Sequence, residues 1–340
     1  MNNFRERVVA AFLGTAIGDA LGAPIEGISW KKRKEIGRVE NYITNGEHPW
    51  NAQLQRGQWT DDTQLTLVVA ESLIANSGRI NMDDMAARHV AALTEAREKG
   101  WDWGRTTTLA VERLATGVHW NESGKNLGEK CGAGNGIAMK MVPIAALLSA
   151  KCRIGFWTYE DVFFLAAMTH ATGAGIAAGF AQVEALRICF KSRCGNSLSV
   201  RTFSHRLSTM ALSGYDFATR LGFPSADFQS LRFRLDVCIP RSDTLNCESI
   251  ARVFGIQGFH AADSLPATLA FFLRNPHSIR TLYDVVNAGG DADSNGAMVG
   301  ALLGAHNGMG IFPQYLVDGL WQRERIVDTA NQLCDVLGIE

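Results

Sequence analysis

Glycine recurs at every fourth position in two apolar segments that lie near opposite ends of the chain. The positions are Gly14, Gly18 and Gly22 in the first segment and Gly296, Gly300, Gly304 and Gly308 in the second. A spacing of four places residues on one face of a helix, although each glycine costs a helix roughly 1 kcal/mol relative to alanine. Such a stripe is retained where it lets a neighbouring helix approach closely. The same spacing is typical of helix dimers in membranes, but the flanking charged residues exclude that interpretation here.

Apolar residues at helical spacing recur along most of the chain and predict an almost entirely α-helical fold. Examples are Leu65, Val68, Val69 and Leu73, and further on Val162, Leu165 and Ala166. With 46% apolar and 20% charged residues, the 340-residue chain can bury a large core. No linker rich in proline, serine or charge divides it, so we expect one compact domain over residues 1–340. A more polar stretch over residues 191–236 is expected to be a peripheral helical region of that domain, with solvated arginines.

The charge balance and the cysteines limit the classes of partner. Lys plus Arg number 33 and Asp plus Glu 34, which leaves no excess basic charge for binding nucleic acid or an anionic membrane. Seven cysteines without a CxxC pair favour a reducing, cytoplasmic compartment over a disulfide framework or a zinc site. No run of about 18 uncharged apolar residues is present, so we expect no membrane span. Asp19 interrupts the first apolar stretch, and residues 8–18 are therefore expected to form a buried first helix rather than a signal peptide.

Two acidic segments each open a predicted helix, and each allows a purely structural interpretation. In the first, Thr60 would be the N-cap, and Asp61 and Asp62 in the first turn would complement the helix dipole. The second segment is Gly289–Gly296, with the sequence GGDADSNG, which begins like an EF-hand calcium loop. The twelfth position of such a loop is Leu302 rather than a bidentate Glu, and the intervening residues are apolar. A calcium loop is therefore excluded.

Taken together, the two acidic segments indicate a metal site. If the two helix N-termini faced each other, their four aspartates would repel one another and would each lose hydration. Divalent cations remove that conflict, and ligation by carboxylate and hydroxyl oxygens alone suits Mg²⁺ or Mn²⁺ rather than zinc. Six such residues are sufficient for a two-metal centre. They are Thr60, Asp61, Asp62, Asp291, Asp293 and Ser294.

Two further segments carry weaker signals. Residues 131–140, with the sequence CGAGNGIAMK, resemble a phosphate-binding loop because glycine N–H groups precede a predicted helix, although a plain glycine-rich turn is the alternative. The loop is neither a Walker A motif nor a dinucleotide-binding GxGxxG motif. His170 lies in an apolar segment, where a single histidine is more often a hydrogen-bonded core residue than a catalytic one.

These segments, in this order and at these separations, resemble the ADP-ribosylglycohydrolase family, which includes the dinitrogenase-reductase-activating glycohydrolases. The similarity extends from about Val8 to Gly310. The matching stretches are Gly18–Gly22 (GDALG), Thr60–Thr63 (TDDT), Gly134–Gly136 (GNG) with Met139, Thr169–His170, and Gly289–Asp291 (GGD) with Asp293. The resemblance implies an all-α, single-domain hydrolase with a dinuclear Mg²⁺ or Mn²⁺ centre, which removes ADP-ribose from a modified side chain.

The resemblance also implies a role for each site residue. The six oxygen-bearing residues above match the metal ligands of the family. The segment that holds the diphosphate of ADP-ribose is matched by Gly132, Ala133, Gly134, Asn135 and Gly136. His170 matches a position in the substrate pocket, and Glu26 matches a mobile glutamate above the metals. Asp62 and Glu26 are therefore the two candidates for the carboxylate that takes a proton from the attacking water.

The sequence departs from the family pattern at three places. The usual GGDTDT motif reads GGDADS here, so Ser294 keeps a ligating hydroxyl, whereas Ala292 lacks one that we assign to support. Lys140 replaces the usual arginine, which keeps a charge but not the planar guanidinium. The segment after His170 lacks a continuation common in bacterial members. This last departure bears on substrate choice rather than on metal binding.

The expected reaction is removal of mono-ADP-ribose from arginine by cleavage of an N-glycosidic bond, through a transition state that resembles an oxocarbenium ion. A second enzymatic alternative is hydrolysis of serine-linked ADP-ribose or of an ADP-ribose ester. A third alternative is a non-catalytic ADP-ribose-binding relative, although all six ligand positions keep an oxygen-bearing side chain. The expected partner is an ADP-ribosylated protein. A cognate ADP-ribosyltransferase toxin is a further partner if the chain is an immunity protein.

Overall fold

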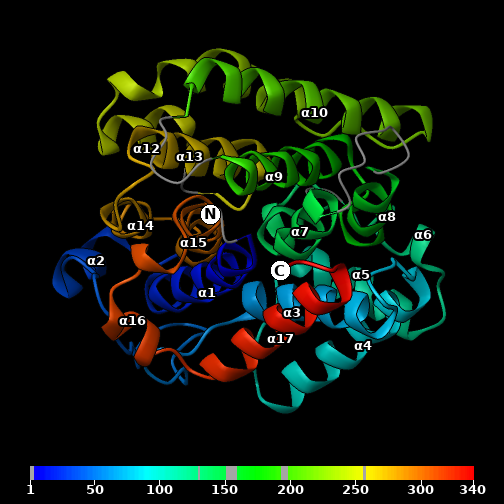
Figure 1. Ribbon diagram of the computed structural model, residues 1–340, viewed down its shortest axis with the longest axis horizontal. Coiled ribbons are helices and arrows are strands. Elements are labelled where there is room, and N and C mark those ends of the chain that lie inside the picture. The colour runs from blue at the N-terminus through cyan, green and yellow to red at the C-terminus, as the bar shows by residue number, and fades with distance from the viewer. Residues whose placement is uncertain (1–3, 129–130, 151–158, 193–197, 256–257) are drawn as a thin grey trace.

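Two helices from opposite ends of the chain, α1 (Phe4–Gly22) and α15 (Ala292–Asn307), lie against each other at the centre of the computed structural model (Figure 1). The structure describes residues 4–128, 131–150, 159–192, 198–255 and 258–340. Both helices are apolar on nearly all sides and are buried over most of their length. They therefore form the inner layer that the other helices cover.

The contact between α1 and α15 is made by the two glycine stripes. A Cβ atom added to Gly14 would overlap the Gly300 carbonyl oxygen, and one added to Gly18 would overlap the Gly296 carbonyl oxygen. One further turn along, a Cβ on Gly304 would overlap a carbonyl oxygen of α1. Each step of four residues along α1 is matched by a step of four in the opposite direction along α15. The helices therefore run antiparallel with backbone against backbone, as the close-approach interpretation of the stripes predicts.

The last glycine of the second stripe does not belong to this contact, contrary to the expectation from its spacing. Helix α15 ends at Asn307, and Gly308 follows it with a φ of +78°, which glycine adopts without a steric penalty. The Gly308 N–H donates to the Gly304 carbonyl oxygen at 2.8 Å. Gly308 therefore terminates the helix, which is the other common use of glycine.

Helix α1 is a core helix, as expected for residues 8–18, and extends further at both ends. Among the described helices, the stretch over residues 4–25 alone is long and apolar enough to cross a membrane, and 94% of its most apolar window is buried inside the fold. Near its start, the buried Arg7 guanidinium donates to the carbonyl oxygens of Ala305 at 2.7 Å and His306 at 2.8 Å. Orphan carbonyl groups at the end of α15 are thus satisfied by a side chain of α1.

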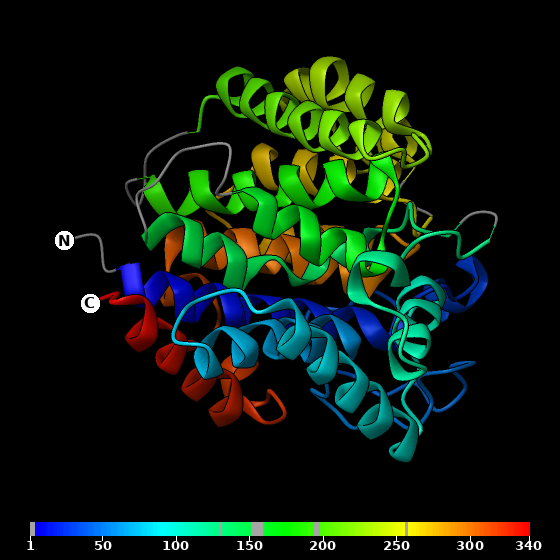
Figure 2. The same ribbon diagram turned by 90° about the vertical axis from the view of Figure 1, so that its right-hand side faces the viewer.

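Layers of helices cover the central pair on both sides (Figure 2). The other α-helices are α2 (Trp30–Ile36), α3 (Asp61–Ala75), α4 (Met82–Glu98), α5 (Arg105–Ala115), α6 (Trp120–Ser123), α7 (Val142–Ala150), α8 (Glu160–Thr169), α9 (Gly173–Lys191), α10 (Val200–Arg220), α11 (Phe228–Phe233), α12 (Cys247–Phe254), α13 (Ala261–Arg274), α14 (Arg280–Val286), α16 (Gln314–Asp318) and α17 (Arg323–Leu337). The short 3-10 or π segments are η1 (Ala23–Ile25), η2 (Asn135–Lys140), η4 (Arg234–Cys238), η5 (Ile239–Thr244) and η6 (Met309–Ile311).

The layers follow from the contacts of the central pair. Helices α9 and α13 contact α15, and α10 lies outside α9, whereas α3 and α17 contact α1 on the other side. The described residues form no β-strand, and their one isolated bridge joins Gly134 to His260. The prediction of an all-α helical fold is confirmed.

Helix α10 lies along the outer edge of the molecule (Figure 1), within the stretch predicted to be peripheral. Arg201 and Arg220 on it are exposed, whereas the guanidinium of Arg206 pairs with the buried Glu184 of α9. Arg193 lies outside the described residues. Arg201 and Arg220 are therefore solvated, as predicted for this stretch. Arg206 instead joins α10 to α9 through its ion pair with Glu184.

The five described cysteines are free thiols, in line with the expectation of a chain without a disulfide framework. They are Cys131, Cys189, Cys238, Cys247 and Cys334. The other two, Cys152 and Cys194, lie outside the described residues.

Replacing Gly300 by alanine should destabilise the protein, because the added methyl group would overlap the Gly14 carbonyl oxygen. Overpacking of this kind costs about 1–3 kcal/mol or more, which exceeds the gain of about 1 kcal/mol in helix propensity. The measurement is the free energy of unfolding from urea titration. Gly310→Ala is the matched control, since a Cβ at Gly310 has no atom within 4 Å. Equal stability of the two variants would contradict backbone-to-backbone packing of the central pair.

Candidate active site

The N-termini of α3 and α15 open into one cavity with a volume of about 740 Å³. Further parts of its wall come from Glu26 after η1 and from Asn135 at the start of η2. Residues 102–107 at the start of α5 and residues 258–260 before α13 also line it, and His170 reaches it from the end of α8. All six residues predicted as metal ligands line this cavity. They are Thr60, Asp61 and Asp62 from α3 and its N-cap, and Asp291, Asp293 and Ser294 from α15 and its N-cap.

The acidic residues at the start of α3 are not used as helix caps. Thr60 occupies the N-cap position, but its side chain makes no capping hydrogen bond. Its hydroxyl instead donates to the carboxylate of Asp19 at 2.8 Å. One carboxylate oxygen of Asp62, Oδ1, is buried and has no hydrogen-bond partner. A buried oxygen without a partner is costly unless a ligand satisfies it, so capping does not account for this segment.

Asp19 of α1 holds the first turn of α3 in place, a role that the sequence analysis missed. Its buried carboxylate accepts hydrogen bonds from the backbone N–H of Thr60 at 2.9 Å and of Thr63 at 3.0 Å. It also accepts from the hydroxyls of both threonines, at 2.8 and 2.6 Å. Asp19 therefore supplies the cap that Thr60 does not. The available signal was a carboxylate inside an otherwise apolar, glycine-striped helix, where a buried charge needs partners.

Hydrogen bonds link the start of α15 to the other walls of the cavity. Ser294 donates its hydroxyl to Oδ2 of Asp62 at 3.3 Å, which joins the N-termini of the two acidic helices. Asp291, at the N-cap of α15, accepts from the side-chain amide of Asn135 at 2.5 Å. The same amide donates to the hydroxyl of Ser264 at 2.9 Å. Asn135 thus positions an acidic residue through its side chain, which its place in a glycine-rich loop did not indicate.

Glu26 forms a carboxylate cluster with Asp291 and Asp293. One oxygen atom from each of the three lies within 4.8 Å of the others, a separation at which a single cation could contact all three. Glu26 itself is half-buried, whereas Asp291 and Asp293 are buried. Every ligand atom in this group is a carboxylate oxygen, the type that Mg²⁺ and Mn²⁺ prefer. Together with the unpartnered Oδ1 of Asp62, the donor set fits a hard divalent cation.

Burial raises the pKa of the three carboxyl groups of this cluster and of the nearby Asp61 and Asp62. It raises the pKa of Asp61 to about 7, with a further contribution from the charge of Asp19, and that of Glu26 to about 8, with a contribution from Asp291. The pKa values of Asp62 and Asp293 are also raised well above the usual value, first by burial and then by neighbouring carboxylates. Without a cation, these values leave Glu26 mostly protonated and Asp61 partly protonated at neutral pH. A bound cation would stabilise the ionised forms instead.

The glycine loop contributes to the cavity over only part of the predicted segment. Gly134, Asn135 and Gly136 line the cavity, whereas Gly132 and Ala133 are buried outside its lining. The backbone N–H of Asn135 already donates to the Phe259 carbonyl oxygen at 3.0 Å. The five-residue segment therefore does not present an uninterrupted row of N–H groups to the cavity.

His170 packs beneath the glycine loop as a neutral side chain. A Cβ atom on Gly136 would lie 3.1 Å from the imidazole ring of His170, and the hydroxyl of Thr169 lies 2.8 Å from its Nδ1. Burial, together with the charge of Lys140, lowers the pKa of His170 to about 3. The Lys140 ammonium is fully buried without a hydrogen-bond partner, and burial lowers its pKa to about 7. A pKa near 7 leaves Lys140 only partly charged at neutral pH, whereas an arginine in its place would stay charged.

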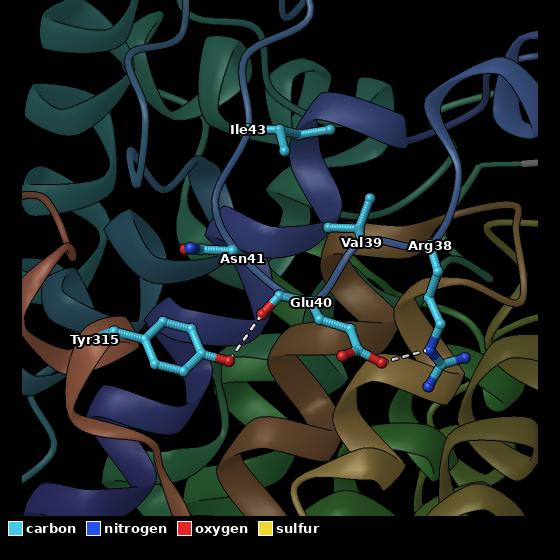
Figure 3. Close-up of a pocket in the computed structure, with 6 residues that line it drawn as sticks. All are labelled: Arg38, Val39, Glu40, Asn41, Ile43 and Tyr315. Atoms are coloured by element: carbon cyan, nitrogen blue, oxygen red, sulfur yellow. Dashed lines mark hydrogen bonds and ion pairs between the residues drawn. The ribbon is translucent and has the colours of Figure 1, made fainter.

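A second, smaller hollow of about 370 Å³ lies elsewhere on the surface (Figure 3). It is lined by Arg38, Val39, Glu40, Asn41, Ile43 and Tyr315, and shares no residue with the acidic cavity. Arg38 is paired there with Glu40 at 2.6 Å, and the Tyr315 hydroxyl donates to the Glu40 carbonyl oxygen at 3.1 Å. Arg38 also pairs with Asp284 at 2.7 Å, and the Tyr315 hydroxyl lies 2.7 Å from that of Tyr283, so the hollow's charged and phenolic side chains are engaged.

The family model described as ADP-ribosylglycohydrolase matches residues 1–338. This protein therefore belongs to the ADP-ribosylglycohydrolase family. A solved structure titled "ADP-ribosylglycohydrolase-related protein complex" is similar with a TM-score of 0.70 and 26% sequence identity, and the match covers 99% of each chain.

Curated relatives are similar over most of the chain. The ADP-ribosyl-[dinitrogen reductase] glycohydrolase of Rhodospirillum rubrum is 26% identical, with 91% of this chain and 88% of the relative covered. The ADP-ribosylarginine hydrolase Tri1 of Serratia proteamaculans is 26% identical, with 96% and 79% covered. The ADP-ribosylhydrolase ARH3 of Mus musculus is 25% identical, with 88% and 84% covered. The family assignment made from the short motifs is confirmed.

In the presence of a chelator, the unfolding temperature should fall as the pH rises from about 5 to about 8. The folded-state pKa values of Glu26, about 8, and Asp61, about 7, lie above their ordinary values near 4, so folding takes up protons in this window. That contribution to stability is complete below the ordinary pKa values and is lost as the pH passes the folded ones. Mg²⁺ or Mn²⁺ should raise the unfolding temperature most at pH 8, because it binds the ionised cluster.

The measurement for this prediction is differential scanning calorimetry at several pH values, with EDTA and with each cation in turn. An unfolding temperature that responds neither to EDTA nor to the cations would contradict a metal site at the carboxylate cluster.

Proposed function

We propose that this protein is a metal-dependent ADP-ribosylhydrolase that removes mono-ADP-ribose from arginine side chains of modified proteins. The observation that carries this proposal is the convergence of carboxylates from three segments in one cavity, whose wall also includes the glycine loop. The two components of the substrate have different requirements, since ribose hydroxyls are bound by hard cations and a diphosphate by backbone N–H groups. The carboxylates and the glycine-loop residues Gly134 and Gly136 line one cavity of about 740 Å³.

Two cations would share the oxygen-bearing residues of the cavity. Glu26, Asp291 and Asp293 lie close enough to hold one, and the start of α3, with Thr60, Asp61 and Asp62, would hold the other. When bound, the cations would supply Lewis acidity for the ribose hydroxyls and for the attacking water. The unpartnered Oδ1 of Asp62 supports its place in this set. A centre with two cations is part of the proposal, and it rests on the carboxylate and hydroxyl oxygens of these residues.

The residues of this chain have three tasks in the reaction. Gly134 and Gly136 would contact the diphosphate, and His170 supports the loop from below as a neutral side chain. Either Asp62 or Glu26 would take a proton from the attacking water, and the unpartnered Oδ1 of Asp62 favours Asp62. The walls of the cavity would fix the distal ribose relative to these carboxylates, which is where orientation contributes to rate.

Arginine is the proposed linkage because one relative is named an ADP-ribosylarginine hydrolase, at 26% identity over 96% of this chain. The chemistry of the cavity fits cleavage of the N-glycosidic bond but does not require it. A protein substrate, rather than nucleic acid or a membrane, agrees with the balanced charge of the chain. We propose a cytoplasmic location and, as a biological role, reversal of ADP-ribosylation, which includes immunity to an ADP-ribosylating toxin.

Asp62→Ala and Asp293→Ala should each reduce turnover by about 10³-fold or more, because each removes a ligand while the cavity keeps its shape. The assay is release of ADP-ribose from a protein carrying ADP-ribosylarginine, with a protein carrying ADP-ribosylserine measured in parallel. Asp83→Ala is the matched control, since Asp83 is also a first-turn aspartate, in α4, but is exposed and outside the cavity. It should keep full activity.

The outcomes of this assay separate the alternatives. Release from the serine-modified protein alone would replace the arginine form of the proposal by the serine form. Release from neither substrate would leave a non-catalytic ADP-ribose-binding protein. Full activity of the Asp62 and Asp293 variants would show that the catalytic residues lie elsewhere.

Gly134→Val should weaken ADP-ribose binding by roughly tenfold or more without unfolding the protein, because the side chain enters the space proposed for the diphosphate. The backbone of Gly134, with φ −75° and ψ 166°, accepts valine, and a Cβ there meets no atom closer than 3.6 Å. Isothermal titration calorimetry with ADP-ribose measures the effect, and Gly310→Val serves as control. Unchanged affinity would make the loop a plain turn.

A further inference from the structure

The carboxylate of Glu26 is held by a short segment that the proposed function does not use. Residues 45–51, here called the strap, contact the backbone that carries Glu26. The side-chain amide of Asn45 donates to the Pro24 carbonyl oxygen at 2.9 Å, and that of Asn51 to the Ala23 carbonyl oxygen at 2.9 Å. Nε2 of His48 donates to the carbonyl oxygen of Glu26 at 2.8 Å. Three side chains of the strap thus bind three carbonyl groups next to the cavity.

The backbone of Glu26 is therefore fixed on both sides. The next residue, Gly27, donates its N–H to the Gly290 carbonyl oxygen at 2.9 Å, directly before the acidic start of α15. On the strap side, His48 is buried, and its Nδ1 accepts the backbone N–H of Asn51 at 2.9 Å. Because Nδ1 is an acceptor, the proton of this neutral imidazole is on Nε2, where it binds Glu26. With its backbone fixed in this way, Glu26 can change conformation only by rotation of its side chain.

Two donors of the strap fix that rotation, and both bind the same carboxylate oxygen. The indole N–H of Trp50 donates to Oε2 of Glu26 at 2.9 Å, and the side-chain amide of Asn51 approaches Oε2 at 3.3 Å. Neither donor uses Oε1. The indole ring packs over Gly27, where a Cβ atom would lie 3.1 Å from it, and the His48 ring meets it edge to face at 4.9 Å. A rigid aromatic donor is thus aimed at one oxygen of a candidate metal ligand.

We infer that Trp50 and Asn51 are positioning residues, which hold Oε2 of Glu26 so that Oε1 is presented to the cation bound by Asp291 and Asp293. This inference rests on the proposed function, because it assigns Glu26 to that cation. Hydrogen bonds from outside the ligand set orient metal ligands and raise their affinity in many proteins. Trp50 serves this purpose from the mouth of the cavity, where its side chain is 42% exposed.

The test is Mn²⁺ binding to the full-length protein, measured by isothermal titration calorimetry. Trp50→Phe keeps the ring and removes the N–H donor, and it should weaken the affinity for Mn²⁺ at one site by about 10- to 100-fold. Trp120→Phe is the matched control, since the Trp120 indole also donates to a carboxylate, Asp83, at 2.9 Å, but lies outside the cavity. In EDTA, the unfolding temperatures of the two variants should agree within about 2 °C.

A double-mutant cycle with Glu26→Gln distinguishes positioning from a general structural role. If Trp50 acts through Glu26, Trp50→Phe should change Mn²⁺ affinity less than twofold in the Glu26→Gln background. Equal effects in both backgrounds, or wild-type affinity in Trp50→Phe itself, would overturn the inference and leave the proposed function intact. The cycle can show the expected coupling although the protein releases no ADP-ribose. That result would support the inference and contradict the proposed function. Absence of Mn²⁺ binding to the wild type would contradict both.

Discussion

Backbone-to-backbone packing of α1 against α15 is the constraint on which the rest of the structure depends. Because glycine faces a carbonyl group at each turn, a shift of one residue in either helix would drive a side chain into the contact. The register is therefore fixed, and with it the place where the C-terminal end of α1 meets the N-terminal end of α15. Asp19 and Asp293 lie at these two ends, and Glu26 follows α1 after the short segment η1. The acidic cavity therefore depends on this register as well as on the loops that line it.

The same arrangement makes the cavity electrostatically unfavourable until a cation is bound. Two helix N-termini contribute partial positive charge, which stabilises an anion by at most about 2 kcal/mol each. They do not offset the burial of five carboxyl groups, as the raised pKa values of Asp61 and Glu26 show. Asp19 differs from this group because four donors from Thr60 and Thr63 satisfy its carboxylate. The fold thus uses one buried aspartate to build the site and leaves the others for a ligand.

The sequence was sufficient for features that repeat or that lie within one segment. Helical periodicity predicted the all-α fold, the glycine spacing predicted close approach of a neighbouring helix without saying which one, and the motifs at Asp61 and Asp293 predicted a shared acidic site. Contacts between two loops could not be predicted from the sequence, because loops have no periodic pattern that shows which residues face each other. The bond from Trp50 to Glu26 and the bond from Asn135 to Asp291 each depend on how two loops meet in space. The helix end at Gly308 was missed because spacing alone does not report the sign of φ.

The central contact also sets the order in which the protein can form during synthesis. Gly18 and Gly296 are neighbours in space, but nearly the whole chain separates them in sequence, and at about 5–20 residues per second the ribosome needs roughly 15 to 60 seconds to make that length. Pairs such as α3 with α4 and α9 with α10 are complete much earlier. Until α15 emerges, an apolar helix that meets the length and composition test for a membrane span has no central partner. The nascent chain therefore exposes this apolar helix for that time, and the acidic cavity is assembled only after α15 has been made.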